Sequence, residues 1–412
     1  MAATTTSETA TARATPGALI VGAGPGGLTC ARILRQGGWR VTVLDGEAGP
    51  QARGQGGSLD LQTESGQWAL ARAGLSEQFA VLAEPEGQSM RILDSTGAVL
   101  LSVAAEAAQH TGNKADTADA AAVPGGDPSD QPNPEIDRRQ LRDLLLDSLA
   151  AGTVRWDERV TEVRLGAGGA TVHTAAGEHR AELLIGADGA WSKVRRALAG
   201  NGTAEPEYSG ISFVEGWPSD IEPASELAAL VGEGSMSAAG VQQKIVVQRS
   251  AFGRARVTFQ FRDALDWAER DGVDTDSDDA VRRYLHGRYA GWAGQLTELI
   301  DACDDGFTVR PVLALPVPHR WRHQRGVTLL GDAAHLMSPF TGMGANSAML
   351  DGAELAIALL GTPDDPDAGL RRYEQRMFPR ASAAAAAARE GLQRNFSDRG
   401  AAGVLAYFTQ FA

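Results

Sequence analysis

The sequence predicts an α/β protein with three parts: a Rossmann-like nucleotide-binding domain, a second domain built on a β-sheet, and a long C-terminal helix. Three observations predict this fold. An apolar strand at 18–21 runs into a glycine-rich turn and a helix. Two later apolar strands, at 181–185 and 326–330, each run into glycine and aspartate. Between them, residues 254–262 alternate polar and apolar side chains, as an antiparallel strand does.

The glycine-rich turn GAGPGG at 22–27 predicts a dinucleotide site. Gly22 lets the chain turn sharply, Gly24 leaves room for a pyrophosphate, and Gly27 lets the helix approach the strand. The free N–H groups at the helix start can then meet phosphate oxygens. A second strand at 39–44 ends at Asp45, whose carboxylate is placed to accept ribose hydroxyls. A plain glycine-rich turn is the alternative.

Composition excludes several classes of partner. The 412-residue chain carries a net charge of −14 and has no dense basic run, so we expect neither a nucleic-acid nor an anionic-membrane partner. No run approaches the roughly 18 apolar residues of a spanning helix. Two cysteines, Cys30 and Cys303, cannot form a disulfide framework, which fits a cytoplasmic location. We expect small-molecule partners and a monomer or weak dimer.

The region between Asp45 and residue 132 contains short elements and one insert. We expect a strand at 56–61, a helix at 63–74, and a hairpin of 90–93 with 98–101. Residues 103–132 are rich in Ala, Asp, Gly and Pro and lack aromatic residues, so they predict a flexible surface insert rather than a regulatory lid. Residues 1–16 are predicted to be a disordered tail.

A helix is predicted to begin at Asn133-Pro134-Glu135, because it would have a side-chain cap, a proline in its first turn and a carboxylate near its positive end. Arg138 and Arg142 would share one face of it. A surface arginine pair is the alternative explanation of that spacing.

Two aspartates follow predicted strands of the first sheet. Asp188 lies between Ala187 and Gly189, before a basic helix that starts at Ser192. Asp332 lies in GDAAH at 331–335, before the loop 339–346 and another helix. Side chains at the carboxyl ends of parallel strands meet at one edge of the sheet. We therefore expect both aspartates at a functional edge, and a discontinuous first domain.

The predicted domain boundaries follow from this pattern. The first domain comprises 17–204 and 307–372, the second comprises 205–306, and 373–412 is the alanine-rich C-terminal helix. In the second domain, Val257, Phe259 and Phe261 would share one face of a strand. That face either packs on helices or lines a pocket.

The motifs at 22–27, 188–189 and 331–335, in this order and at wide spacing, resemble the single-component FAD-dependent monooxygenases of the aromatic-hydroxylase group. Within that group the chain is most similar to the tetracycline-inactivating flavin monooxygenases. GGSLDL at 56–61, NPEIDR at 133–138, SKVR at 192–195 and residues 331–340 carry the similarity. It spans from about Gly17 to the C-terminal helix, and implies a glutathione-reductase-type FAD domain beside a β-sheet substrate domain.

The resemblance implies where FAD and NADPH bind. Asp332 would hold the ribityl chain of FAD, with Asp60 and Arg138 also on the cofactor, and Arg53 matches a position linked to NADPH. NADPH is expected rather than NADH. Asp188 would lie near the pyrophosphate or the passing nicotinamide nucleotide. The expected cofactor residues are Gly22, Gly24, Gly27, Asp45, Arg53, Gly57, Asp60, Arg138, Asp188, Asp332, Gly342, Gly344 and Ala345.

The resemblance also implies the reaction. Reduced flavin and O2 form a C4a-hydroperoxide that delivers one oxygen atom, so no side chain is required as a nucleophile. We expect an aromatic or polyketide-like substrate, in antibiotic inactivation or in tailoring. The expected substrate residues are Met236, Phe259, Pro339, Phe340 and Gly342, which would keep water out. The stretches 234–237 and 257–259 differ from the polar strands of the tetracycline enzymes.

Three alternatives are weighed against this function. A halogenase would carry a second tryptophan in the stretch WPSDI at 217–221, and a dehydrogenase would use the same flavin. A non-catalytic binding protein of this fold would not need Asp332 and Arg138. His335 is expected to bond the backbone rather than act in catalysis. No stretch resembles a metal cluster or a Ser/His/Asp set.

Overall fold

A five-stranded parallel sheet forms the centre of the nucleotide-binding part. The strand order is β17 (Val327–Leu329), β11 (Leu184–Gly186), β1 (Gly17–Val21), β2 (Arg40–Leu44) and β7 (Val154–Arg155). Both faces of β1 are buried, as in parallel sheets that are covered by helices. The late strand β17 pairs with β11, so residues more than 300 positions apart in sequence share this sheet. The computed structural model describes residues 16–52, 57–83, 89–103, 133–200, 205–218, 226–232, 234–249 and 255–409.

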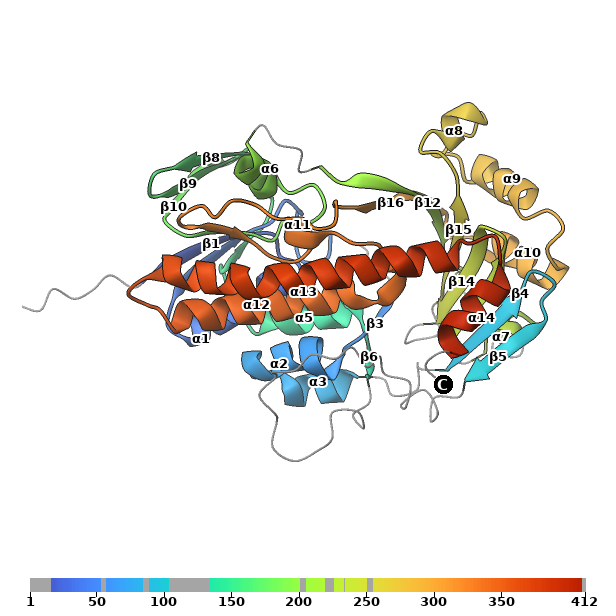
Figure 1. The fold of residues 1–412 in the computed structure, drawn as a ribbon, viewed down its shortest axis with the longest axis horizontal. Helices are drawn as coiled ribbons and strands as arrows, with labels where there is room; N and C mark the ends of the chain where they lie inside the picture. Colours follow the sequence, from blue (N-terminus) through green and yellow to red (C-terminus); the bar gives the residue numbers. More distant parts are fainter. Residues whose placement is uncertain are drawn as a thin grey trace, which may run out of the picture.

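Two helices pack on the sheet with almost no space between their backbones. They are α1 (Pro25–Gln36) and α12 (Met343–Leu360). A Cβ placed on Gly352 would lie 2.3 Å from the carbonyl oxygen of Gly26, and one placed on Gly26 would lie 2.5 Å from that of Ala348. Glycine is therefore required at this crossing, where the first turn of α1 packs against the middle of α12. The two helices lie side by side (Figure 1).

Smaller elements complete this part of the molecule. Strands β8 (Val160–Gly166), β9 (Gly169–Thr174) and β10 (Gly177–Ala181) form an antiparallel sheet beside α6 (Lys193–Ala199). A π turn at Thr63–Gln67 leads into α2 (Trp68–Ala73) and α3 (Ser76–Leu82), on the side of α5 (Arg138–Asp147). Residues Ser58–Asp60 (β3) pair with Glu135–Asp137 (β6).

The helix predicted to begin at Asn133 begins later. Residues 135–137 form strand β6, and the α5 helix starts at Arg138. The side chain of Asp137 accepts hydrogen bonds from the backbone N–H groups of Arg139 (2.8 Å) and Gln140 (3.2 Å). Strand pairing with β3 prevails over the local capping signal, because Ile136 is fully buried in the core.

A seven-stranded sheet forms the second part. Its order is β16 (Phe307–Ala314), β12 (Glu207–Gly216), β15 (Ala255–Arg262), β14 (Gln243–Arg249), β13 (Ser235–Gly240), β4 (Met90–Asp94) and β5 (Val99–Val103). Helices α7 (Glu226–Val231), α8 (Trp267–Arg270), α9 (Asp278–Arg288) and α10 (Gly294–Ala302) cover one face with a hydrophobic core. The hairpin at 90–103 and the strand at 307–314 thus belong to this sheet, outside the range 205–306.

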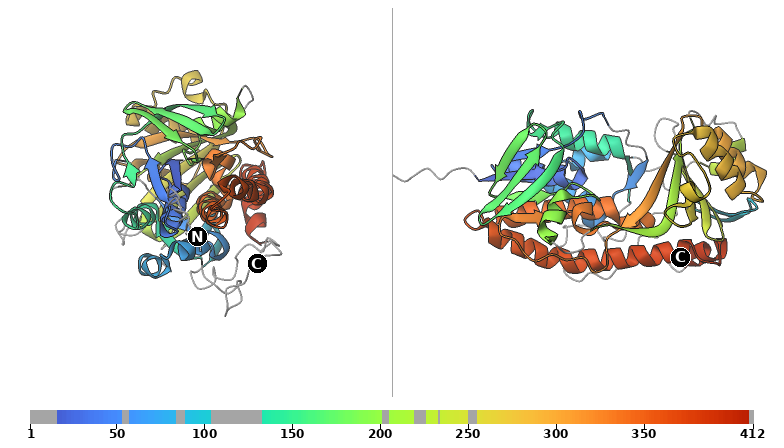
Figure 2. Two further views of the ribbon diagram at one scale, coloured as in Figure 1. Left: turned by 90° about the vertical axis from the view of Figure 1, so that its left-hand side faces the viewer. Right: turned by 90° about the horizontal axis from the view of Figure 1, so that it is seen from above.

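The C-terminal helix connects the two parts. Helix α13 (Pro366–Asn395) packs on α12 at one end and reaches the seven-stranded sheet at the other, where α14 (Ala401–Thr409) lies against β4 and β13 (Figures 1 and 2). It starts seven residues before the predicted 373, at a cap from the Asp365 side chain. Within the described ranges, no helix is both long and apolar enough to cross a membrane. The predicted tail, the insert after 103 and Arg53 lie outside the described residues.

Candidate active site

The glycine turn after β1 has the geometry expected for a pyrophosphate site. Gly22 has a φ of 108°, and a Cβ there would lie 2.1 Å from the Ala187 carbonyl oxygen. A Cβ on Gly27 would lie 2.3 Å from the Gly22 carbonyl oxygen, whereas one on Gly24 would meet nothing within 4 Å. Gly22 and Gly27 are therefore required by packing, and only Gly24 leaves open space in front of the helix start.

Asp45 lies beside this turn. One of its carboxylate oxygens accepts the backbone N–H of Ala23 (2.7 Å) and the other accepts that of Glu47 (2.9 Å). These two bonds fix the carboxylate at the end of β2. Each oxygen keeps a lone pair that can accept a ribose hydroxyl.

Asp332 begins helix α11 (Asp332–His335) after β17. Its side chain is exposed to water, yet loss of water to the surrounding protein raises its pKa, against the opposing charges of His335, Arg138 and Arg195. Asp332 follows β17, so it lies at the carboxyl edge of the parallel sheet, within reach of the charges of Arg138 and Arg195.

Arg138 lies near Asp332, whose charge acts on it. Its guanidinium is exposed, and the surrounding protein, followed by the charge of Arg256, lowers its pKa. Among the described residues it has no hydrogen-bonding partner, although Asp332 and Glu215 are near enough to act on its charge. Its backbone N–H donates to Gly57 (3.1 Å), so β3 and α5 hold it in place. An unpartnered guanidinium beside a carboxylate is suited to a polar ligand.

Asp60 and the start of α12 lie together. Loss of water raises the pKa of the Asp60 carboxyl, and a hydrogen bond with Glu135 opposes this. The buried Asn346 side chain donates to the Asp60 carbonyl (2.7 Å) and accepts the N–H groups of Gln62 (3.0 Å) and Gly66 (3.2 Å). Sequence reasoning missed Asn346, because only the fold shows that it ties β3 to α12.

The N-terminus of α12 is open. Gly342 caps it with a φ of 66°, and within the described ranges no side chain accepts a hydrogen bond from its first N–H groups. A Cβ at Gly342 or Gly344 would meet nothing within 4 Å. The first N–H groups of this 18-residue helix, which include that of Ala345, lack helical acceptors and carry the positive end of its dipole.

Asp188 has a structural task. One oxygen accepts the Ser192 hydroxyl (2.5 Å) and the other accepts the Lys193 N–H (2.7 Å), so the carboxylate holds the start of α6. Burial raises its pKa against these bonds. The buried Arg195 of α6 then donates to the Ala333 carbonyl (3.0 Å), which joins the Asp188 turn to α11. A role of Asp188 toward a nucleotide stays a prediction.

His335 bonds a carboxylate, and the expectation of a backbone partner is wrong. Its Nε2 lies 2.5 Å from Asp351 Oδ2, which also accepts the Gly331 N–H (3.0 Å), while Arg380 donates to the other oxygen (2.7 Å). Burial disfavours charge on both, but the pair raises the pKa of His335 and lowers that of Asp351. The cluster supports the Gly331–Asp332 turn from behind.

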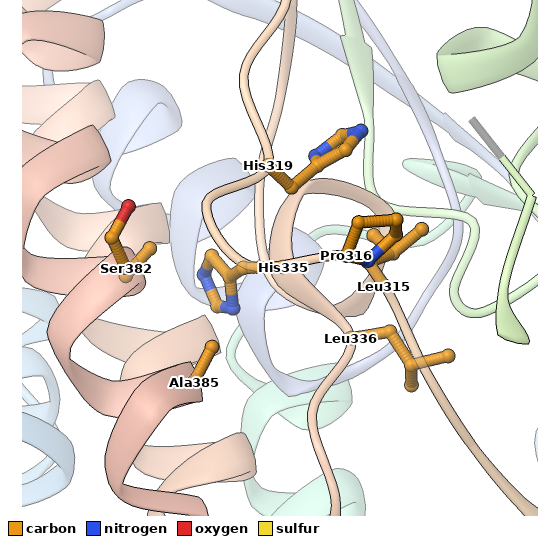
Figure 3. Close-up of a pocket in the computed structure, with 8 residues that line it drawn as sticks. Leu315, Pro316, His319, His335, Leu336, Ser382 and Ala385 are labelled. Carbon is orange, nitrogen blue, oxygen red and sulfur yellow. The ribbon is translucent and has the colours of Figure 1, made fainter. Parts of the chain in front are cut away.

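A small cavity adjoins this cluster (Figure 3). It has a volume of about 10 Å³, enough for one water molecule, and His335, His319 and Ser382 contribute polar atoms to its lining. The Nδ1 of His335 is buried without a protein partner. A water molecule there would satisfy it, so this cavity belongs to the support of Asp332 and is not a substrate pocket.

The prediction that Met236 and Phe259 line the substrate pocket is wrong. Both are fully buried in the core under α7–α10, where the Phe259 ring packs edge-on against Tyr289 at 5.7 Å. Alternation along the strands decides this, because the helices cover the more apolar face. Phe340 instead packs against Phe213 and Phe396, and Pro339 is exposed.

The opposite face of the seven-stranded sheet is here called the inner face. The sequence prediction assigned no substrate residue to it. By strand register it carries Phe213, Glu215, Lys244, Val246, Gln248, Arg256, Thr258 and Gln260. A Cβ on Gly57 would lie 3.3 Å from the Arg256 guanidinium, so this face looks toward β3 and Arg138. Arg256 also donates to Gln248 (2.8 Å) and Glu215 (3.4 Å). The seven-stranded sheet therefore does carry polar side chains, but they lie on the face opposite to Met236 and Phe259.

These residues fit an FAD cofactor. Gly24 and Asp332 follow β1 and β17 of the same parallel sheet, and the charge of Asp332 acts on the Arg138 guanidinium. The uncapped start of α12 is tied to β3 by Asn346. They offer anion-binding N–H groups, a cation and a hydroxyl acceptor, which are the groups that a pyrophosphate, an isoalloxazine and a ribityl chain require. Within the described ranges, no cluster of three potential metal ligands occurs.

Comparison with known proteins identifies the family. The FAD binding domain family matches residues 16–388. The chain belongs to this family. The FAD-binding protein is 29% identical over 440 residues to monooxygenase penA of Penicillium thymicola, which covers 93% of this chain and 96% of the relative. It is 28% identical over 372 residues to the FAD-dependent urate hydroxylase of Mycolicibacterium vanbaalenii, covering 88% and 85%.

Solved structures share the fold. Klebsiella pneumoniae HpxO, complexed with FAD and uric acid, has a TM-score of 0.77 at 23% identity, over 96% of this chain and 92% of that one. Tetracycline destructase Tet(51) has a TM-score of 0.69 at 18% identity, over 96% of both chains. Together with the family match, the relatives identify this FAD-binding protein as a flavin-dependent monooxygenase that acts on a small molecule with O2.

Proposed function

We propose that this monooxygenase takes electrons from NADPH and inserts one oxygen atom into an aromatic or polyketide-like small molecule. The observation that carries the proposal is the pairing of two surfaces: the cofactor edge with Asp332 and Arg138, and the inner face with Arg256 and Glu215. The pKa of Arg138 is shifted by charges on both surfaces, by Asp332 of the first and by Arg256 and Glu215 of the second. A substrate on the inner face would therefore lie next to a flavin held at the edge.

Each part of the cofactor edge has a task in this proposal. The helix start at Gly24 would receive the pyrophosphate and Asp332 would accept ribityl hydroxyls. The open α12 N-terminus would face the flavin end that becomes negative on reduction, where its dipole and N–H groups stabilise that charge. FAD, when bound, supplies the oxygen transfer chemistry. The protein positions the two reactants and keeps water out.

The inner face, where we place the substrate, is more polar than the apolar pocket that the sequence predicted. Phe213 and Phe340 are half-buried on or beside the inner face and can pack on a ring. The same face carries Arg256, Lys244 and Gln260, which can bind substrate oxygens. This mixture supports an oxygenated aromatic or polyketide-like substrate, with apolar contacts for orientation and polar contacts for selection.

The similarity to tetracycline destructases supports a polyketide antibiotic as one candidate. The urate hydroxylase and 3-amino-4-hydroxybenzoate 2-monooxygenase among the relatives support smaller oxygenated rings. Antibiotic inactivation and tailoring of a secondary metabolite both fit this range. The choice of NADPH rests on Arg53 in the sequence.

The test is a substrate screen with the purified protein. The protein is expected to be yellow and to consume NADPH slowly alone and faster with a substrate. Mass spectrometry should find a product heavier by one oxygen atom, and peroxide release should fall when that product forms. A colourless protein that takes up no FAD, or fast NADPH oxidation that no compound alters, contradicts the proposal.

A further inference from the structure

Lys244 is a buried cation on the inner face. It lies in β14, directly opposite Gln260 of β15, and only 6% of its surface is exposed. Its Nζ donates to the Asn395 side-chain oxygen (2.6 Å), at the end of α13. Buried lysines are rare without a carboxylate, so the surroundings of this ammonium require explanation.

The hydrogen-bonding capacity of this pair is incompletely used. An ammonium has three N–H donors, and within the described part of the chain Lys244 uses one, for Asn395. The Gln260 side-chain oxygen is buried without a partner. Among the residues that the structure describes, no charged group contributes to the titration of Lys244, and burial alone lowers its pKa to about 8. A cation with unused N–H donors and a neutral acceptor without a partner therefore occupy neighbouring positions.

The two side chains are held on a rigid base. Asn395 donates from its Nδ2 to the Gly391 carbonyl (2.8 Å), which leaves its oxygen turned to Lys244. On the other side of the sheet, the Tyr289 hydroxyl lies 3.0 Å from the Lys244 carbonyl and 3.1 Å from the Gln260 carbonyl. Backbone and partner are thus fixed. The unused N–H groups of Lys244 are left for the Gln260 oxygen, a water molecule or a ligand that enters.

The inner face opens next to this pair. Val246 follows Lys244 on the same face, Ser237 lies across from Val246, and Phe213 lies across from Gln260. All three are partly exposed. The Ser237 hydroxyl oxygen is buried without a partner as well. Lys244 is therefore buried, whereas these three residues around it on the inner face are partly exposed to solvent.

We propose that Lys244 and Gln260 form an anion subsite for the substrate, in which the ammonium binds an enolate or phenolate oxygen and Gln260 accepts an adjacent O–H or N–H. This inference rests on the proposed function and names its substrate class: rings that carry an ionisable hydroxyl beside a second donor. The subsite involves binding only and moves no proton.

A purely structural tether between β14 and α13 is the competing explanation, and Asn395→Asp separates the two. A carboxylate at 395 would keep a partner for Lys244, because it pairs directly with the ammonium, although it cannot donate to the Gly391 carbonyl as Asn395 does. It would also neutralise the ammonium that the anion needs. A tether predicts unchanged ligand binding by the folded variant, whereas an anion subsite predicts weaker binding by it.

The probe is 4-nitrocatechol, whose ionised phenol lies beside a second hydroxyl, and the control ligand is its dimethyl ether. Binding to the holoprotein is measured by calorimetry at a pH where the probe is ionised, together with FAD content, NADPH consumption and the unfolding midpoint of each preparation. The variants are Lys244→Met, Asn395→Asp and Ile245→Val, the last being a control that trims the core face of the same strand.

We expect wild type and Ile245→Val to bind the probe at least about tenfold tighter than the ether, and both other variants to lose that preference. Asn395→Asp retains a partner for Lys244 and its binding is compared in the folded fraction, so it decides the matter even if Lys244→Met does not fold. The proposal is overturned if wild type does not prefer the ionised probe, or if Asn395→Asp keeps the preference. Loss of FAD or of NADPH oxidation in wild type would instead contradict the proposed function.

Discussion

Gly24→Ala should separate cofactor binding from folding. A Cβ at Gly24 would meet no atom within 4 Å, and the backbone there (φ −78°, ψ 172°) is one that alanine adopts freely. The folding cost should therefore be only about 0.5 kcal/mol, from a poorer helix cap. The new methyl group, however, would stand where a pyrophosphate approaches the helix start.

The expected loss is in FAD affinity. Displacing the phosphate weakens a charge-assisted hydrogen bond to the backbone, which is worth about 1.5–3 kcal/mol. The affinity for FAD should then fall roughly tenfold to a hundredfold. Gly27→Ala is the matched control, because its Cβ would lie 2.3 Å from a backbone carbonyl oxygen. It should cost about 3 kcal/mol in stability.

The assay uses protein stripped of FAD. Unfolding is followed by circular dichroism without cofactor, because a bound ligand would itself raise the midpoint. FAD is then titrated into the folded protein while its fluorescence is recorded. A Gly24→Ala protein that is folded and binds FAD as wild type does would refute the placement of the pyrophosphate at this turn.

Three further predictions concern the support of Asp332, the sheet faces and α12. Asp351→Asn should cost about 3 kcal/mol, because it leaves the buried His335 without its counter-ion. The pair stabilises the fold most between the ordinary pKa values of 3.8 and 6.5; the gain fades as pH rises through the raised pKa of His335 and as it falls through the lowered pKa of Asp351. Urea unfolding across pH checks this, and a difference independent of pH counts against it. Phe259→Ala should cost about 3–5 kcal/mol and leave substrate affinity unchanged in the folded fraction. Thr258→Val, on the inner face, should change stability little and weaken substrate affinity. If Phe259→Ala weakens substrate affinity and Thr258→Val does not, Phe259 lines the substrate pocket after all. Gly344→Asp has room for its side chain and should slow flavin reduction by NADPH in stopped-flow measurements, because it places a negative charge at the α12 N-terminus. An unchanged rate would exclude that role of the helix.

Local sequence was sufficient for the cofactor edge. The turn at 22–27 and the aspartate after β17 depend on residues a few positions apart: glycines that permit a turn, an apolar strand, and a polar group at its end. Gly24, Asp45 and Asp332 follow β1, β2 and β17, whose carboxyl ends form one edge of the parallel sheet. Asp60 and Arg138 were expected on the cofactor only from the resemblance to flavin monooxygenases, and their role stays a prediction. Parallel strands that end together make such an edge predictable.

The inner face and its partners were decided only by tertiary structure. The alternation in 254–262 defined two faces, but it contained no information on which face the helices would cover. In the structure the helices cover the face of Phe259, which packs against Tyr289. Arg256 and Gln260 therefore lie on the opposite, inner face. Likewise, Asn133 offered a good helix cap, yet pairing of β6 with β3 buried Ile136 and moved the helix start to Arg138.

The sequence by itself determined that this protein has a dinucleotide turn, an aspartate at a late strand end and the order of the parts between them, since these follow from contacts between near neighbours in the chain. Tertiary structure alone decided that Asp351 holds His335, that Asn346 ties β3 to α12, and that Lys244 meets Asn395. Each of these bonds joins segments whose proximity depends on the packing of the entire core. No local pattern of residues encodes such proximity.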